Sequence, residues 1–328
     1  MIVVTGGAGF IGSNIVAALE ARGAGRVVVC DRLRDGVKWL NLAKRELHDI
    51  VRPGHLMEFL DDHRMEVETI IHMGAISATT ETDADLIFET NFRLSMDLWR
   101  WCADNQARFL YASSAATYGD GARGFVDDWS PQSLAAFRPL NAYGWSKNLF
   151  DKRVSRMIED GEHAPPQWAG FKFFNVYGPN EYHKGGQKSV VAHVFPSAKA
   201  GKPARLFKSH HPDYEDGGQL RDFIWVGDCV DVLMWFLDNE GVSGIFNCGT
   251  GQARSFADLA GAVFRALGRE PEIEYIPTPE VLRDKYQYYT QADMARLREA
   301  GYAKSFTSLE DGVARYVRDY LDREDPCL

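Results

Sequence analysis

Two side chains in the middle of the chain have the types and the spacing of a proton-transfer pair. Tyr143 and Lys147 are four positions apart in a stretch, 143–158, whose apolar residues recur at helical spacing, so both would lie on one face of a helix. A nearby ammonium favours the phenolate. We therefore expect the pKa of Tyr143 to be lowered towards neutrality, where the phenol can serve as a general acid or base.

A serine offers a third group for the same chemistry. The strand-like run 108–113 leads directly to Ser114, whose hydroxyl would emerge at the carboxyl edge of a sheet. A serine that hydrogen-bonds a substrate oxygen, a tyrosine that moves its proton and a lysine that holds a ribose form a hydride-transfer site. The alternative is that Ser114 only satisfies a strand end and that Tyr143 is simply packed.

Three glycines near the start of the chain predict where a cofactor would bind. Gly6, Gly9 and Gly12 follow a β-branched run and open an amphipathic stretch. In such a strand-turn-helix unit the glycines permit a tight turn, close approach of the main chain to a diphosphate, and packing of the helix on the sheet. The diphosphate would lie at the helix N-terminus, where free N–H groups and the macrodipole favour anions. The sequence therefore predicts a dinucleotide site.

The residues after the second apolar run, 27–30, bear on the choice of cofactor. Asp31 stands where a ribose hydroxyl is usually held, which suits NAD. Arg32 follows it and Lys38 is near, and cations beside this position suit a 2′-phosphate. We favour NADP, with NAD as the alternative.

Composition excludes several classes of partner. The chain has 328 residues, 45% of them hydrophobic, and a net charge of −9 without the basic stripe that nucleic-acid binding needs. No apolar stretch reaches the ~20 residues of a membrane span, and the first residues do not resemble a signal peptide, so we expect no membrane partner and a cytoplasmic protein. The five cysteines are far apart, which favours reduced thiols over disulfides or a metal site.

Strand-like and helical runs alternate along the first half of the chain, which predicts an α/β fold with a doubly wound parallel sheet of the Rossmann type. The pattern becomes rich in loops from about Tyr177. We expect a dinucleotide-binding domain over 1–176, which also receives later segments near 220–250. A smaller α/β substrate domain would cover 177–328, with a substrate crevice between the two.

The glycine loop, Ser114, Tyr143 and Lys147 together resemble the extended short-chain dehydrogenase/reductase family, which includes nucleotide-sugar epimerases and dehydratases. Several further strings, spread over nearly the whole chain, are similar to the branch of that family that epimerises ADP-activated heptoses at C6. They include Phe-Asn-Val-Tyr-Gly-Pro at 174–179, His-Lys-Gly at 183–185 and Thr-Gln-Ala-Asp at 290–293.

The resemblance implies a reaction and a set of contacts. Bound NADP would oxidise C6 transiently and reduce it again from the opposite face, in the service of lipopolysaccharide synthesis, and Lys184 would be a second proton-handling residue. Homo-oligomers are common in the family. The implied cofactor contacts are Gly6, Gly9, Phe10, Ile11, Gly12, Asp31, Arg32, Lys38, Gly74, Ala75, Ile76, Ser77, Asn91, Lys147 and Val176. The implied substrate contacts are Ser114, Asn175, Lys184, His193, Phe207, Lys208, Arg221 and Tyr286.

Other functions remain as alternatives. A UDP-hexose 4-epimerase would use the same three catalytic residues, and a non-catalytic NADP-sensing protein would need only the glycine loop. A dehydratase is disfavoured because Ala115 and Ala116, rather than an acidic pair, follow Ser114. The stretch 209–220 is longer than in the family. Its histidines and acids could suggest a metal, but they lack ligand spacing and are better explained as a solvated insertion.

Overall fold

A seven-stranded parallel sheet forms the larger part of the chain in the computed structural model, which describes residues 1–34, 36–280 and 287–328. The strand order is β10-β6-β5-β4-β1-β2-β3, and every pairing is parallel. Strands β1, β2, β4, β6 and β10 are buried along their whole length, as the continuous apolar runs predict. The strands are β1 (Ile2–Thr5), β2 (Val27–Cys30), β3 (Asp49–Val51), β4 (Thr69–His72), β5 (Arg108–Ser114), β6 (Trp168–Phe173) and β10 (Gly244–Cys248).

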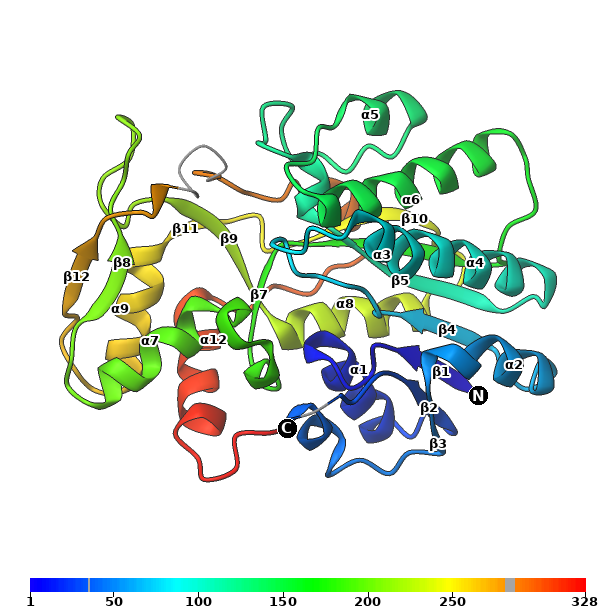
Figure 1. Cartoon of the computed structure of the whole chain (residues 1–328), viewed down its shortest axis with the longest axis horizontal. Helices are drawn as coiled ribbons and strands as arrows, with labels where there is room; N and C mark the ends of the chain where they lie inside the picture. Colours follow the sequence, from blue (N-terminus) through cyan, green and yellow to red (C-terminus); the bar gives the residue numbers. More distant parts are fainter. Residues whose placement is uncertain (35, 281–286) are drawn as a thin grey trace.

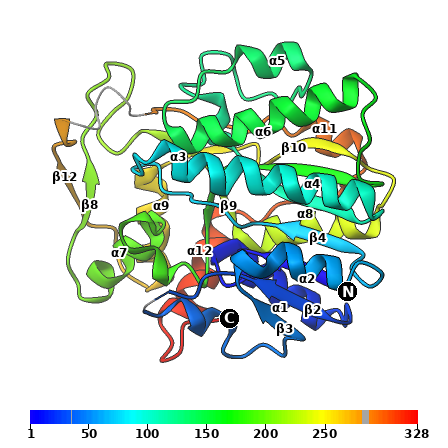
Figure 2. The same ribbon diagram turned by 45° about the vertical axis from the view of Figure 1, so that its right-hand side comes forward.

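Helices cover both faces of this sheet (Figures 1 and 2), which confirms the predicted doubly wound α/β fold. One face carries α1 (Phe10–Ala21), α8 (Val226–Asp238) and α11 (Ala295–Glu299). The other carries α2 (Leu56–Asp62), α4 (Leu94–Asp104) and α6 (Ala142–Glu159). Three shorter elements, α3 (Ala84–Ile87), the π-helical η3 (Phe88–Arg93) and α5 (Pro131–Ala136), lie beside α4 and α6.

A second group of elements has its own core (Figure 1). It contains a three-stranded sheet, β11-β9-β7, and a two-stranded parallel sheet, β12-β8. Helices α7, α9 and α12 pack together beside them. The bounds are β7 (Asn175–Tyr177), α7 (Val190–Lys199), β8 (Ala204–Phe207), β9 (Leu220–Trp225), β11 (Ala253–Ser255), α9 (Phe256–Ala266), β12 (Ile273–Ile276), α12 (Leu309–Tyr316) and the π-helical η6 (Val317–Leu321).

The chain crosses between the two groups more than once. After β9 it returns through α8 to β10, which pairs with β6 at the edge of the large sheet. The segment near 220–250 is therefore divided: α8 and β10 join the large sheet as expected, whereas β9 pairs with β7 and β11 in the small one. The domain boundary at 176 stays a prediction.

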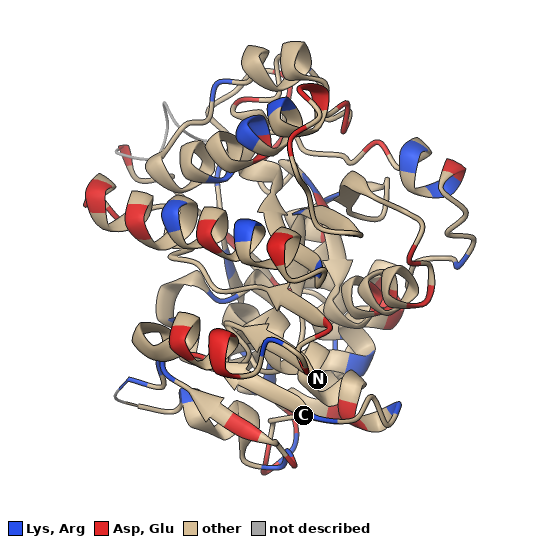
Figure 3. Cartoon of the chain, turned by 90° about the vertical axis from the view of Figure 1, so that its right-hand side faces the viewer, with Lys and Arg blue, Asp and Glu red and all other residues tan. Residues whose placement is uncertain are grey.

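Figure 3 shows Lys and Arg interspersed with Asp and Glu along the helices. All five cysteines are buried and free. Within the described ranges, no helix has the length and hydropathy to cross a membrane, and no cluster of three or more His, Cys, Asp or Glu side chains could hold a metal ion.

Candidate active site

The glycine loop joins β1 to α1 and touches the loop that follows β4. Gly6 has a φ of +65°, and a Cβ there would lie 2.6 Å from the backbone nitrogen of Gly74. A Cβ on Gly12 would lie 2.2 Å from the Gly6 carbonyl oxygen. Only glycine fits these two positions, so the main chain forms an open cradle at the N-terminus of α1, which suits a diphosphate.

A hydrogen-bonded chain fixes the position of the β4 loop. The Gly74 amide donates to Thr5 Oγ1 (3.1 Å), which in turn is 2.6 Å from Nδ1 of His72. The Ser95 hydroxyl donates to the Asn91 carbonyl, so it accepts from His72 Nε2 at 3.0 Å. Burial lowers the pKa of His72 to about 3, so the ring is neutral. It therefore links Thr5 on one side to Ser95 on the other.

Asn91 lies behind this loop and is 1% exposed. Its Oδ1 accepts from the Ile76 amide, and its Nδ2 donates to the Ile76 carbonyl and to Ser146 Oγ on α6. Both amide hydrogens are therefore engaged by the protein. The geometry makes Asn91 a support for the residues 74–77 that were predicted to contact the cofactor.

Asp31, at the end of β2, is held by cations and amides. Its carboxylate accepts from the Ala8 amide (2.9 Å), from the Arg32 amide (2.6 Å) and from Lys38 Nζ (2.5 Å). Lys38 comes from η1 (Lys38–Leu42), a 3-10 turn, and the Arg32 side chain is exposed. The predicted group of one acid and two cations is thus assembled beside the glycine loop.

The candidate catalytic residues meet where β5 ends and α6 begins. The Ser114 hydroxyl caps η4 (Ala115–Tyr118) by accepting from the Ala116 amide at 3.1 Å. Helix α6 starts with Asn141, whose side chain accepts from the Gly144 amide, so Tyr143 lies in the first turn. The structure thereby brings the tyrosine next to the serine, as predicted.

The expected pKa of Tyr143 was wrong in direction. Burial raises the pKa of its phenol, the interaction with the Ser114 hydroxyl opposes that rise, and the carboxylate of Asp151 adds to it. Desolvation of the phenol is the largest cause of the shift, and the spacing of Tyr143 and Lys147 along the sequence does not reveal it.

Lys147 is 3% exposed. Burial lowers its pKa to about 8, and Asp151 one turn further along α6 opposes the shift. Within the part of the chain that the structure describes, its ammonium has no hydrogen-bond or ion-pair partner. A buried ammonium of this kind needs an acceptor, and the ribose hydroxyls of a dinucleotide would supply one.

A buried ion pair beneath these residues was not predicted. Lys172 on β6 donates to Asp151 Oδ2 (2.6 Å) and to Thr117 Oγ1 (2.8 Å), and both charged side chains are fully buried. The carboxylate also accepts from Tyr111 (3.0 Å) and Ser113 (2.6 Å) on β5. One signal was present in the sequence: a lysine inside an otherwise apolar strand requires a buried partner.

Replacing Lys172 with methionine is expected to destabilise the protein by about 3–5 kcal/mol, because the Asp151 carboxylate would remain buried without its counter-ion. The free energy of unfolding in urea measures the loss. The double variant Lys172→Met with Asp151→Leu removes both charges and should recover part of it; a single variant as stable as the wild type would contradict the expectation.

Lys184 lies in η5 (Tyr182–Gln187), the turn that follows β7, where its ammonium is 5.3 Å from the centroid of the Phe10 ring. Burial lowers the pKa of Lys184, and the carboxylate of Glu181 opposes the shift. Phe10 is the first residue of α1, so a residue far along the chain reaches the cofactor cradle. The structure thus places the second predicted proton-handling group beside the glycine loop.

The remaining predicted substrate contacts come from several elements. Asn175 on β7 donates to Thr290 Oγ1 (3.2 Å), and His193 on α7 is exposed, with Nε2 3.3 Å from the Gly186 carbonyl. The Arg221 guanidinium lies 5.6 Å from the Phe256 ring and donates to the Leu220 carbonyl. Val176 is half-buried on β7, Phe207 is half-buried on β8, and Lys208 is exposed just after it. Tyr286 lies outside the described residues.

The family model that matches this chain covers the residues from the first to the last strand of the large sheet. The model of the NAD dependent epimerase/dehydratase family matches residues 2–249, from the start of β1 to just beyond β10. The chain belongs to this family. With the NAD dependence of the family, the glycine cradle and the buried Lys147, which has no ion-pair partner among the described residues, support a nicotinamide dinucleotide as the cofactor class.

Individual members of the epimerase/dehydratase family are similar over their full length. A Nitratidesulfovibrio vulgaris protein named ADP-L-glycero-D-manno-heptose-6-epimerase is 51% identical over 330 residues, covering 100% of both chains. A Fusobacterium nucleatum protein of the same name is 46% identical over 336 residues, again covering 100% of both. The Helicobacter pylori enzyme of that name has a solved structure with a TM-score of 0.79 and 27% identity, covering 97% of this chain and 95% of the other.

The UDP-glucose 4-epimerase of Thermus thermophilus, solved with NAD, has a TM-score of 0.76 and 26% identity, covering 96% of this chain and 97% of the other. The fold is therefore shared among epimerases of the family that act on different sugars. Fold alone does not choose the substrate.

Asp222 on β9 joins the small sheet to the end of the large one, and the sequence analysis missed it. Its Oδ1 accepts from the Thr250 amide and hydroxyl, both at 2.7 Å, and its Oδ2 accepts from the amides of Gly251 (2.9 Å) and Ala292 (3.0 Å). Burial raises the pKa of this carboxyl, and these hydrogen bonds oppose the rise. Asp222 thereby fixes the loop after β10 next to Asn175.

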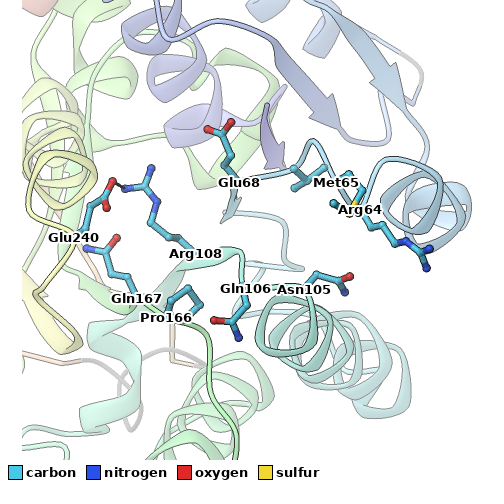
Figure 4. A pocket seen from close by; sticks show the side chains of 10 residues that line it. Arg64, Met65, Glu68, Asn105, Gln106, Arg108, Pro166, Gln167 and Glu240 are labelled. Atoms are coloured by element: carbon cyan, nitrogen blue, oxygen red, sulfur yellow. Dashed lines mark hydrogen bonds and ion pairs between the residues drawn. The ribbon is translucent and has the colours of Figure 1, made fainter.

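A pocket of about 550 Å³ lies at the opposite edge of the large sheet (Figure 4). Its lining includes Glu68, Arg108 and Gln167, which stand at or just before the beginnings of β4, β5 and β6. The guanidinium of Arg108 is already paired with Glu240 at 2.9 Å. The pocket is separate from the catalytic residues, which lie at the carboxyl edge.

Proposed function

We propose that the chain inverts C6 of the heptose in ADP-D-glycero-D-manno-heptose, giving ADP-L-glycero-D-manno-heptose. The observation that carries the proposal is that two groups able to handle protons lie at the carboxyl ends of strands of one sheet: Lys184 beside Phe10, after β1, and Tyr143 beside Ser114, at the end of β5. An inversion needs a group of this kind on each face of the reacting carbon. Full-length relatives at 46–51% identity bear the name of this activity.

The protein's own residues supply binding and proton transfer. A bound nicotinamide ring would supply the hydride chemistry at C6. Ser114 would position the C6 hydroxyl, and Tyr143 in its ionised form would take the hydroxyl proton as the ketone forms. Lys147 would hold the ribose, and its ammonium would stabilise the ionised form of Tyr143 against the burial that raises the pKa of the phenol. After the ketone turns its other face, the Lys184 ammonium would give a proton to the C6 oxygen, and exchange with solvent would then remove the proton from Tyr143 and restore the one on Lys184.

For the cofactor we propose NADP. Asp31 is paired with Lys38, and the next residue, Arg32, has an exposed side chain, so a 2′-phosphate would meet a net positive charge from Arg32 rather than a free carboxylate. The nucleotide that stays bound through purification identifies the cofactor by mass spectrometry. Recovery of NAD alone would contradict this choice.

Turnover in heavy water is expected to leave C6 of the product free of deuterium, because the hydride that leaves C6 comes back to the same carbon. Proton NMR of the product measures this directly. Deuterium at C6 would show that a proton from solvent replaces the hydrogen, which requires a different mechanism.

The choice of substrate is tested by comparing ADP-D-glycero-D-manno-heptose with UDP-galactose under the same conditions. We expect kcat/KM to be higher for the heptose by about a hundredfold or more, since the site's polar groups would be left unpaired by the wrong sugar. A preference for UDP-galactose would identify a UDP-hexose 4-epimerase. Activity on neither would favour the NADP-sensing protein.

A further inference from the structure

The turn that carries Lys184 is only partly buried. The first three residues of η5 are half-buried and the last three are exposed, and Gly185 interrupts the turn with a φ of +56°. Within the turn, His183 Nδ1 lies 3.3 Å from Asn41 Nδ2, and Tyr182 packs on Tyr316 with ring centroids 6.5 Å apart. The position of the Lys184 ammonium also depends on what holds the two residues before the turn and its first residue. Glu181 is held by α7 and α12, since its carboxylate accepts from Ser189 Oγ (2.6 Å) and Tyr316 (2.9 Å).

Glu181 is thus one anchor of the Lys184 turn, and Asn180 is a second. Asn180 is fully buried in a left-handed conformation, with a φ of +73°. Its Nδ2 donates to Ser13 Oγ on α1 at 2.9 Å, and its carbonyl accepts from Asn41 Nδ2 on η1 at 3.0 Å. The same Asn41 nitrogen donates to the carbonyl of Ala8, inside the glycine loop, at 2.9 Å. These contacts connect the Lys184 turn with the cofactor cradle.

The third anchor is the segment 325–328, which we call the C-terminal strap. The Leu328 amide donates to Asn180 Oδ1 (2.9 Å), and Tyr182, the first residue of η5, donates its hydroxyl to the Pro326 carbonyl (2.8 Å). The strap is tied down in turn by Lys44, which donates to the Cys327 carbonyl (2.6 Å) and pairs with Asp325 (2.9 Å). Figures 1 and 2 show the end of the chain beside the segment that follows β2.

We propose that the C-terminal strap is a positioning element for the reaction: by bonding to Asn180 and Tyr182 it fixes the turn that carries Lys184 against the start of α1. The inference rests on the proposed role of Lys184. Residues of the strap touch neither the glycine loop nor Tyr143 in any hydrogen bond of the described chain, so their effect passes through the turn. A displacement of a reacting group by about 1 Å can cost a hundredfold in rate, and the strap supplies two of the bonds that prevent it.

The test compares a chain that ends at Glu324 with the full chain. We expect kcat to fall by about tenfold or more, with KM changed by less than about threefold, because the strap orients a reacting group rather than binding substrate. Hydrogen exchange of the amides 182–188 should become faster, while the affinity for NADP stays the same. The variant Tyr182→Phe removes one of the bonds and should give the same changes to a smaller extent.

Lys199→Met is the matched control. The variant breaks an exposed ion pair between Lys199 on α7 and Asp322 near the C-terminus, which are 2.7 Å apart. This pair does not involve the Lys184 turn, so kcat and the hydrogen exchange of amides 182–188 should stay unchanged. If the shortened chain is not folded, the double variant Tyr182→Phe with Lys44→Met replaces it. Unchanged kcat and unchanged hydrogen exchange at 182–188 in a folded variant would overturn the proposal. A fall in kcat no greater than that of the Lys199→Met control would overturn it as well.

Failure of the strap can be told apart from failure of the proposed function. If Lys184→Met keeps full activity, the role of Lys184 is wrong, whatever the strap does. If Lys184→Met loses activity but the shortened chain does not, the strap alone is refuted.

Discussion

Tyr143→Phe is expected to lower kcat by about a thousandfold while the nicotinamide cofactor remains bound, because the change deletes only the hydroxyl proposed to transfer the proton. The ring still fills its place in the first turn of α6. The neighbouring Lys147, which would hold the ribose, is untouched. Initial rates with ADP-heptose and cofactor content by absorbance measure the two effects separately.

Tyr302→Phe provides the control for this prediction. Tyr302 is buried against Trp235, with ring centroids 5.9 Å apart, and is not among the predicted catalytic or binding residues, so the same loss of a hydroxyl should leave kcat within about twofold of the wild type. Near-normal turnover in Tyr143→Phe would refute its assignment as the acid–base residue. Loss of the cofactor in that variant would show that the phenol acts in binding instead.

Lys184→Met is expected to lower kcat by about a hundredfold or more, with little change in cofactor affinity. Methionine keeps an unbranched chain over the Phe10 ring, so the variant removes the ammonium and preserves most of the packing. Since burial lowers the pKa of Lys184, more of it is neutral near pH 7 than for an ordinary lysine, which suits a group that both takes and gives a proton.

The corresponding control is Lys202→Met, an exposed lysine just after α7, for which no change in rate is expected. Retention of full activity in Lys184→Met would show that Lys184 does not handle a proton in the reaction. If Tyr143 and Lys184 act on opposite faces of one carbon, either single variant should already stop inversion, and the double variant should be hardly slower than the worse single one.

Much of the large sheet could be predicted from the sequence because its strands are short, fully buried apolar runs bounded by turns. The runs 2–5, 27–30 and 69–72 coincide with β1, β2 and β4. The destination of β9 could not be read in this way, because a buried strand looks the same whichever sheet it joins. Its pairing with β7 and β11 is decided by tertiary contacts.

In the candidate site, too, local features were predictable and tertiary ones were not. Residue types and spacing predicted Ser114, Tyr143 and Lys147, because a strand end and one face of a helix are local features. The pKa of Tyr143 was mispredicted because burial is not local. Similarly, the engagement of Asn91 by Ile76 and Ser146 depends on elements that meet only in the folded chain.

The carboxamide of Asn41 has one further consequence. Its nitrogen spans two backbone carbonyls, one in the loop that would cradle the diphosphate and one beside the turn of Lys184. Any shift of one loop is thereby transmitted to the other through a single rigid group. If Lys184 donates the second proton as proposed, a shift of the glycine loop on nucleotide binding would also move the turn that carries this ammonium, so cofactor binding and alignment of Lys184 would be coupled through Asn41.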